Sequence, residues 1–170
     1  MLGKDRLKKK KHMAKKFVTH QDKVIFQKNL LPVGMIKSKN ETIIKAGNGK
    51  WVIQGKACCL QGDEGKVKLK AKYENTVLAA IPGTPVMGEG QFKIIPFAPG
   101  FPHLSKKHTI GGKSKIVQKG ATKFKVQFIV SKPYKKILPP PAGTTLQDPV
   151  PIYLGQAHFV VKTNTKETEA

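Results

Sequence analysis

Arginine is nearly absent from this basic chain. Of the 32 lysine and arginine residues only Arg6 is an arginine, and only 10 aspartate and glutamate residues balance them, which gives a formal net charge of +22. The planar guanidinium group reads base edges and binds phosphate in a bidentate manner. The net charge therefore indicates an anionic partner, such as nucleic acid, a membrane surface or an acidic protein face. The near absence of arginine argues against a surface of this protein that reads base edges. A solvated lysine surface is the simpler interpretation.

Cysteine is also scarce. The only two cysteines, Cys58 and Cys59, are adjacent. Adjacent cysteines do not close an ordinary disulfide loop, and on a strand their side chains point to opposite faces. We interpret them as small apolar strand residues of a protein in a reducing compartment.

Long apolar runs are missing. The sequence has no stretch of about 18 apolar residues, so it predicts no membrane-spanning helix. The N-terminus is rich in lysine but lacks the apolar region of a secretory signal. Residues 1–16 have almost nothing to bury, so we expect a disordered basic tail, in which Met13 is an alternative translation start to Met1. Residues 163–170 are expected to form a polar C-terminal tail.

Catalytic motifs are absent as well. The sequence has no G-x-x-x-x-G-K-[ST], H-E-x-x-H or G-x-S-x-G motif, and the Gly111–Ser114 segment lacks the first glycine of a phosphate loop. Asp63 and Glu64 form the only pair of adjacent acidic residues, which we interpret as a capped turn. The chain is predicted not to be an enzyme.

Histidine imidazole and cysteine thiolate groups are common metal ligands, so a structural metal ion, zinc or iron, is an open hypothesis. The candidate donors are His20, His103, His108, His158, Cys58 and Cys59. None of them has the C-x-x-C or H-x-x-x-H spacing of a metal site. The sequence therefore names no ligand set.

Short apolar runs bounded by glycine recur about every ten residues, which indicates an all-β fold. Residues 67–73 and 122–130 alternate between apolar residues and mostly lysine or glutamine, as in strands with one buried face. Lysines on an exposed strand also discourage edge pairing. Prolines exclude a helix of useful length from residues 81–88 and 96–102, and Pro139–Pro141 favour extended polyproline backbone.

Two β-hairpins of similar sequence are predicted. In the first, an apolar run ending at Ile53 reaches a Gln54-Gly55 turn and returns through residues 57–60. The second has the same order around Gly111-Gly112. Each hairpin precedes one of the alternating strands. We therefore expect one β domain over residues 17–162, with a weak internal duplication of units at about 51–73 and 108–130.

The first hairpin resembles the repeat of PAAR proteins, the spike-tip proteins of type VI secretion and related contractile injection systems. The matching positions are Ile53, Gly55, Lys56, Gly62 and Asp63 in the first unit, and Ile110, Gly112 and Lys113 in the second. The Pro-Ala-Ala-Arg signature itself is absent, since residues 57–60 occupy its place. The chain is therefore identified as PAAR-like.

The resemblance implies a small cone or prism of short β-hairpins. Its base would continue a trimeric β-helical spike protein, and its apex carries a metal bound by histidine and cysteine in many family members. A structural protein of this kind would cap the spike, aid puncture of a target membrane and carry effector cargo. It would assemble in a bacterial cytoplasm and leave the cell with the spike. The alternative is a basic β-domain of an RNA-binding or ribosomal protein.

Overall fold

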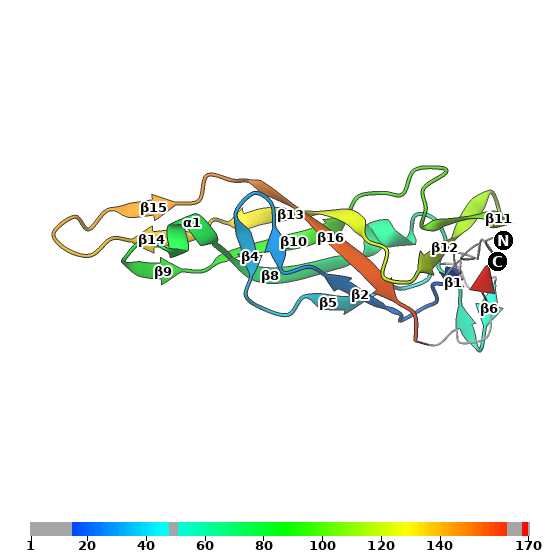
Figure 1. Ribbon diagram of the computed structural model, residues 1–170. Coiled ribbons are helices and arrows are strands. Elements are labelled where there is room, and N and C mark those ends of the chain that lie inside the picture. The colour runs from blue at the N-terminus through cyan, green and yellow to red at the C-terminus, as the bar shows by residue number, and fades with distance from the viewer. Residues whose placement is uncertain (1–14, 48–50, 163–167, 170) are drawn as a thin grey trace, which may run out of the picture.

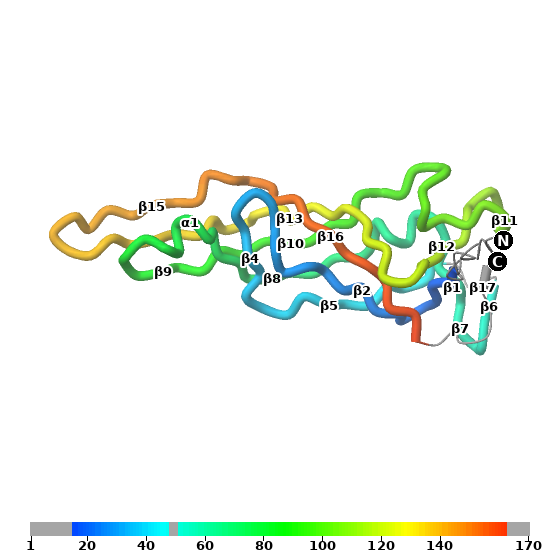
Figure 2. Tube along the Cα trace, viewed as in Figure 1, coloured from blue at the N-terminus to red at the C-terminus, as the bar shows by residue number. Residues whose placement is uncertain are grey.

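The structure is a computed structural model that describes residues 15–47, 51–162 and 168–169. The molecule is elongated and tapers from a broad end, where β1 and β17 lie, to a narrow end beyond β9, β14 and β15 (Figures 1 and 2). Strands make up 54% of the described residues and helical segments 6%. The predicted all-β cone or prism is thereby confirmed.

An eight-stranded antiparallel sheet, here named the curled sheet, forms the middle of the molecule. Its strands, in sheet order, are β3 (Asn29–Leu30), β4 (Gly34–Ile36), β8 (Lys68–Asn75), β10 (Gly88–Ile94), β13 (Phe124–Lys132), β16 (Ile152–Val160), β2 (Lys23–Phe26) and β5 (Glu41–Ile43). The backbone N–H and carbonyl of Leu31 pair with those of Leu154, at 2.7 and 3.0 Å. This pairing brings the end of β3 to β16, so the sheet curls round the main core.

Aromatic rings fill the inside of the curled sheet. Tyr73, Phe92, Phe128 and Tyr153 are fully buried there, with Phe92 and Phe128 packed edge to face. The neighbouring strand makes room for the ring of Phe128 with a glycine, because a Cβ at Gly90 would overlap that ring. Small residues opposite large rings allow a narrow, curled sheet to have a packed interior.

The two predicted alternating strands are confirmed as β8 and β13. Along β8 the lysines are exposed while Ala71 and Tyr73 are buried. Along β13 the residues Phe124, Val126 and Phe128 are buried. β8 lies between β4 and β10, but β4 pairs only with residues 73–75 of β8, so the stretch with Lys68 and Lys70 is an edge on that side, as the lysines predict.

The narrow end is a three-stranded sheet of β15 (Thr145–Gln147), β14 (Lys135–Ile137) and β9 (Thr84–Val86), next to the one-turn helix α1 (Thr76–Ala79). The expected polyproline segment is wrong: β14 and β15 form a hairpin, and Pro139–Pro141 lie in its loop. The Leu138 N–H donates to the Thr144 carbonyl at 2.9 Å across this loop. Prolines lack an N–H, so a loop suits them.

The broad end holds a four-stranded sheet in the order β11 (Leu104–Ile110), β12 (Lys113–Lys119), β1 (Lys15–Phe17) and β17 (Thr168–Glu169). Beside it lies the small hairpin of β6 (Val52–Ile53) and β7 (Lys56–Ala57), followed by the short 3-10 helix η1 (Asp63–Lys66). Of the expected basic tail, Lys15 and Lys16 belong to β1, and residues 1–14 lie outside the described residues. So does most of the expected C-terminal tail, except β17.

Candidate functional site

The first predicted hairpin is present at the broad end. Val52 pairs with Ala57 and Ile53 with Lys56. Gln54 and Gly55 between them have φ values of 49° and 76°, which is the geometry of a two-residue hairpin turn with a right-handed strand twist. A Cβ at Gly55 would contact nothing, so the positive φ explains this glycine. The hairpin prediction is confirmed, although each strand is only two residues long.

The second hairpin has the same turn. Ile110 pairs with Lys113 across Gly111 and Gly112, whose φ values are 56° and 77°. Its strands are longer, with seven residues each. Ile53, Gly55 and Lys56 of the first unit and Ile110, Gly112 and Lys113 of the second therefore lie in or beside equivalent turns, whereas Gly62 and Asp63 lie in a later turn at η1. Their importance for function stays a prediction.

The returning strands of both hairpins meet a third segment of the chain, here named the three-segment junction (residues 15–20, 57–61 and 114–119). The Cys59 N–H donates to the Val18 carbonyl, the Val18 N–H to the Ile116 carbonyl, and the Ile116 N–H to the Cys59 carbonyl, each at 2.9 Å. Every residue donates to one neighbour and accepts from the other. The three hydrogen bonds thus form a closed ring with a threefold pattern.

Each segment continues this pattern on both sides of the ring. Phe17 pairs with Val117, and isolated bridges join Thr19 to Cys58 and Leu60 to Lys115. Each segment therefore pairs with one partner before the ring and with the other partner after it. Because each segment has a partner before and after the ring, none of the three forms a free sheet edge within the junction.

The side chains of the junction form two layers. Val18, Cys59 and Ile116 belong to the main core, whereas Phe17, Cys58 and Val117 form a second cluster with Ile53. Cys58 and Cys59 thus face opposite sides, as predicted. Burial raises the pKa of the Cys59 thiol far above its usual range. A neutral thiol of this kind is a packing group and not a reactive one.

Two of the three segments each end in a turn that is held by hydrogen bonds to an aspartate carboxylate. The Asp63 carboxylate accepts from the Leu60 N–H at 2.9 Å, and the Asp63 N–H donates to the Leu60 carbonyl at 2.9 Å. Asp22 makes the same two bonds with Thr19, at 2.8 and 3.1 Å. Gly62 and Gln21, one residue before each aspartate, have φ values of 103° and 70°.

This second turn, and with it the third segment of the junction, was not predicted from the sequence. The signal was present: Asp22 follows Thr19 at the same spacing as Asp63 follows Leu60. The residue before Asp22 is Gln21, whereas Gly62 precedes Asp63, so the two turns do not share a recognisable Gly-Asp motif.

The adjacent acids Asp63 and Glu64 bind backbone groups of three chain segments. Glu64 accepts from the Gly62 N–H at 2.7 Å and from the Phe97 N–H at 3.0 Å, and Asp63 also accepts from the Gly47 N–H at 3.2 Å. The predicted capped turn is confirmed. These carboxylates fix the exit from the junction towards β8.

A buried lysine connects the two hairpins. Lys115 of β12 is only 2% exposed, and its Nζ lies 3.5 Å from the centroid of the Trp51 ring and 4.9 Å from that of Phe17. A desolvated ammonium over aromatic faces is a favourable cation–π contact. Trp51 thereby attaches the first hairpin to the second.

The histidines do not gather into a metal site. No three histidine, cysteine, aspartate or glutamate residues come together in the described part of the chain. His103 is enclosed by four phenylalanine rings, and burial lowers its pKa. His20 uses its Nδ1 to accept the Ala46 N–H at 3.0 Å. The donors in residues 15–47, 51–162 and 168–169 therefore do not fit the metal that the resemblance implies.

A buried carboxylate joins the narrow end to the curled sheet. Asp148 Oδ2 accepts from the hydroxyls of Tyr73 and Tyr153, both at 2.7 Å. Its Oδ1 accepts from Asn75 Nδ2 at 3.1 Å and from the Val150 N–H at 3.0 Å. Four donors, three from the strands β8 and β16 and one from the segment before β16, thus share one carboxylate.

The narrow end carries almost no charge. Residues 75–88 and 137–147 contain no ionisable side chain, although the whole chain has a net charge of +22. Val77, Val86, Met87 and Ile137 are exposed there. Lys136 is buried and its Nζ donates to the Ala79 carbonyl at the end of α1, at 3.2 Å. Neither helix of the described residues has the length and apolar character needed to cross a membrane.

These features define a tapered all-β structural protein with a three-segment broad end and a narrow end of low charge. The family model for contractile injection system spike tip proteins matches residues 13–169, and the chain belongs to this family. Its role as a structural component of the spike tip follows from this membership. No curated protein matches the chain.

Proposed function

We propose that one copy of this protein caps the end of a trimeric spike and docks on it through the broad end. The three-segment junction carries the proposal. A trimer presents three equivalent surfaces around its axis, and the ring of Val18, Cys59 and Ile116 offers three similar strand segments around one centre. A single chain with this pattern can make comparable contacts with each subunit of the trimer.

The narrow end then points away from the spike. Charged side chains are expensive to move into hydrocarbon, and residues 75–88 and 137–147 have none. The prolines of the β14–β15 loop and the Asp148 hydrogen bonds limit the flexibility of this end. These properties suit a structural point driven mechanically through a target membrane, without enzymatic activity of its own.

Two further parts of the proposal concern the machine as a whole. The tip assembles on its spike in the bacterial cytoplasm and leaves the cell when the system contracts. Effector cargo bound to the tip would travel with it, and its export would depend on this protein.

The test is docking on the trimeric spike protein of the same injection system. Native mass spectrometry should find one copy per trimer. Val52→Glu, at a residue of the broad end that is 56% exposed, should abolish docking, whereas Val77→Glu, at a residue of the narrow end that is 58% exposed, should not. A protein that stays monomeric beside its spike, or loses docking only through Val77→Glu, contradicts the proposal.

A further inference from the structure

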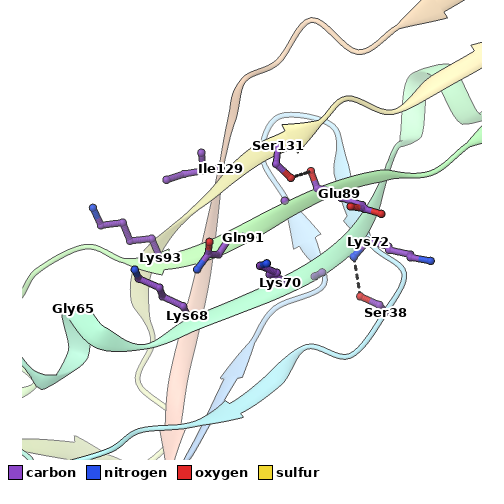
Figure 3. A pocket seen from close by; sticks show the side chains of 12 residues that line it. Ser38, Gly65, Lys68, Lys70, Lys72, Glu89, Gln91, Lys93, Ile129 and Ser131 are labelled. Atoms are coloured by element: carbon purple, nitrogen blue, oxygen red, sulfur yellow. Dashed lines mark hydrogen bonds between the residues drawn. The ribbon is translucent and has the colours of Figure 1, made fainter. Parts of the chain in front are cut away.

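Four lysines share the outer face of the curled sheet, here named the lysine face. Lys68, Lys70 and Lys72 come from β8 and Lys93 from β10, and they line a hollow of about 750 Å³. Gln91, Ser131, Ile129 and the acid Glu89 are among the other residues that line it. Figure 3 shows the lysines over these two neighbouring strands.

Among the described residues, three of the four lysines have no acidic partner, whereas Lys72 lies directly opposite Glu89 in the strand register. Lys93 lies directly opposite Lys68 in the strand register, and Lys70 lies opposite Gln91. Glu89, the acid of this face, forms its ion pair with Lys132 at 3.4 Å. Lys68, Lys70 and Lys93 have no carboxylate within 4.0 Å among the described residues.

Like charges directly opposite each other on a sheet are destabilising. β4 covers only residues 73–75 of β8, so among the described strands Lys68 and Lys70 have a partner on one side only, and protection of this edge explains part of their presence. A ligand from outside the chain would supply the missing negative charge. The hollow and the shortage of acids give the lysine face the character of a binding surface as well as that of a protected edge.

The chemistry of the face favours phosphate. An ammonium group is a compact point charge that binds phosphate without a fixed planar geometry. Alternate residues on a strand lie roughly 7 Å apart, so the lysines of β8 form a row of separate positive sites. Such a row matches several phosphate groups on a surface better than one small anion.

We propose that the lysine face binds the phosphate headgroups of an anionic phospholipid membrane. Its position on the molecule supports this ligand: β8 and β10 lie between the broad end and the narrow end (Figure 1), where residues 75–88 and 137–147 carry no charge. When the narrow end enters hydrocarbon, the lysines behind it reach the headgroup layer. The inference rests on the proposed function, because it requires the narrow end to lead.

The experiment measures binding of the purified protein to vesicles of phosphatidylcholine with phosphatidylglycerol. The variant Lys68→Gln/Lys70→Gln/Lys93→Gln should bind about one hundredfold more weakly, since each lysine near an anionic surface contributes about a factor of five. The matched control is Lys16→Gln/Lys113→Gln/Lys119→Gln, which removes the same charge from the broad end. It should bind almost as the unchanged protein does.

Further arms identify the source of the phosphate. Binding should fall steeply as salt rises and should be absent with phosphatidylcholine alone. Equal losses in both triple variants overturn the lysine face, because overall charge would then explain binding. Preference for inorganic polyphosphate or a single-stranded RNA over the vesicles overturns the lipid assignment. Docking on the spike is measured in a separate experiment. A failure to dock contradicts the proposed function, and the vesicle-binding result can still be interpreted.

Discussion

Replacement of Asp148 tests whether the narrow end is held to the curled sheet by one carboxylate. In Asp148→Ala, the hydroxyls of Tyr73 and Tyr153 and the Nδ2 of Asn75 lose their acceptor inside the core. An unsatisfied buried donor costs about 1–3 kcal/mol. Three such donors, partly relieved by entering water, predict a loss of about 3–6 kcal/mol in the free energy of unfolding.

The matched variant is Asp148→Asn. Its amide keeps the acceptor for Asn75 and Val150, and its NH₂ group can donate to the tyrosine oxygens after their hydroxyls rotate. We therefore expect a loss of only about 1–2 kcal/mol. Urea unfolding followed by circular dichroism gives both values. Equal losses in the two variants, or a loss below 1 kcal/mol in Asp148→Ala, would refute the assigned role of the network.

The same network predicts alkaline sensitivity. Burial, and then the hydrogen bond to Asp148, raise the pKa of Tyr73 and of Tyr153 far above the usual tyrosine value. The unfolded chain therefore loses these protons near pH 10 while the folded chain keeps them. Stability should be fully present below about pH 10 and fall above it. A urea midpoint that does not change between pH 9 and 11 would contradict this assignment.

Three further predictions concern other parts of the molecule. Trp51→Ala should lower the free energy of unfolding by about 1–2 kcal/mol, and Trp51→Phe by less, because the cation–π contact with Lys115 is lost or weakened; urea unfolding measures both. Burial lowers the pKa of His103, so its contribution to stability is present above about pH 6.5 and lost as the pH falls below it. His103→Phe should flatten that part of the pH profile, and an unchanged profile would exclude His103 as its source. Gly90→Ala should destabilise by more than 1 kcal/mol through overlap with the Phe128 ring, and a neutral result by thermal unfolding would show that the ring moves aside.

Local patterns predicted much of this fold. Each hairpin turn depends on two consecutive residues with positive φ, which are Gln54-Gly55 in the first hairpin and Gly111-Gly112 in the second. The alternating burial of β8 and β13 likewise follows from residues two apart. Such features need no information from distant parts of the chain.

The features that sequence reasoning missed are pairings between distant segments. The ring of Val18, Cys59 and Ile116 joins residues about 40 to 100 positions apart in the chain, and its hydrogen bonds use the backbone, which is the same for every residue. The Leu31–Leu154 pairing is of the same kind. The metal hypothesis depended on the distances between histidine and cysteine side chains. Their spacing in the sequence did not determine these distances, and the structure places the side chains apart.

The junction also decides how the molecule would carry load. Each of its segments leads, through a turn, into a strand of the curled sheet: the first into β2, the second through η1 into β8, and the third into β13. Both β8 and β13 run lengthwise (Figure 1). A push applied at the broad end would therefore divide among three covalent paths before reaching the packed aromatic interior, so no single hairpin would bear the whole compression.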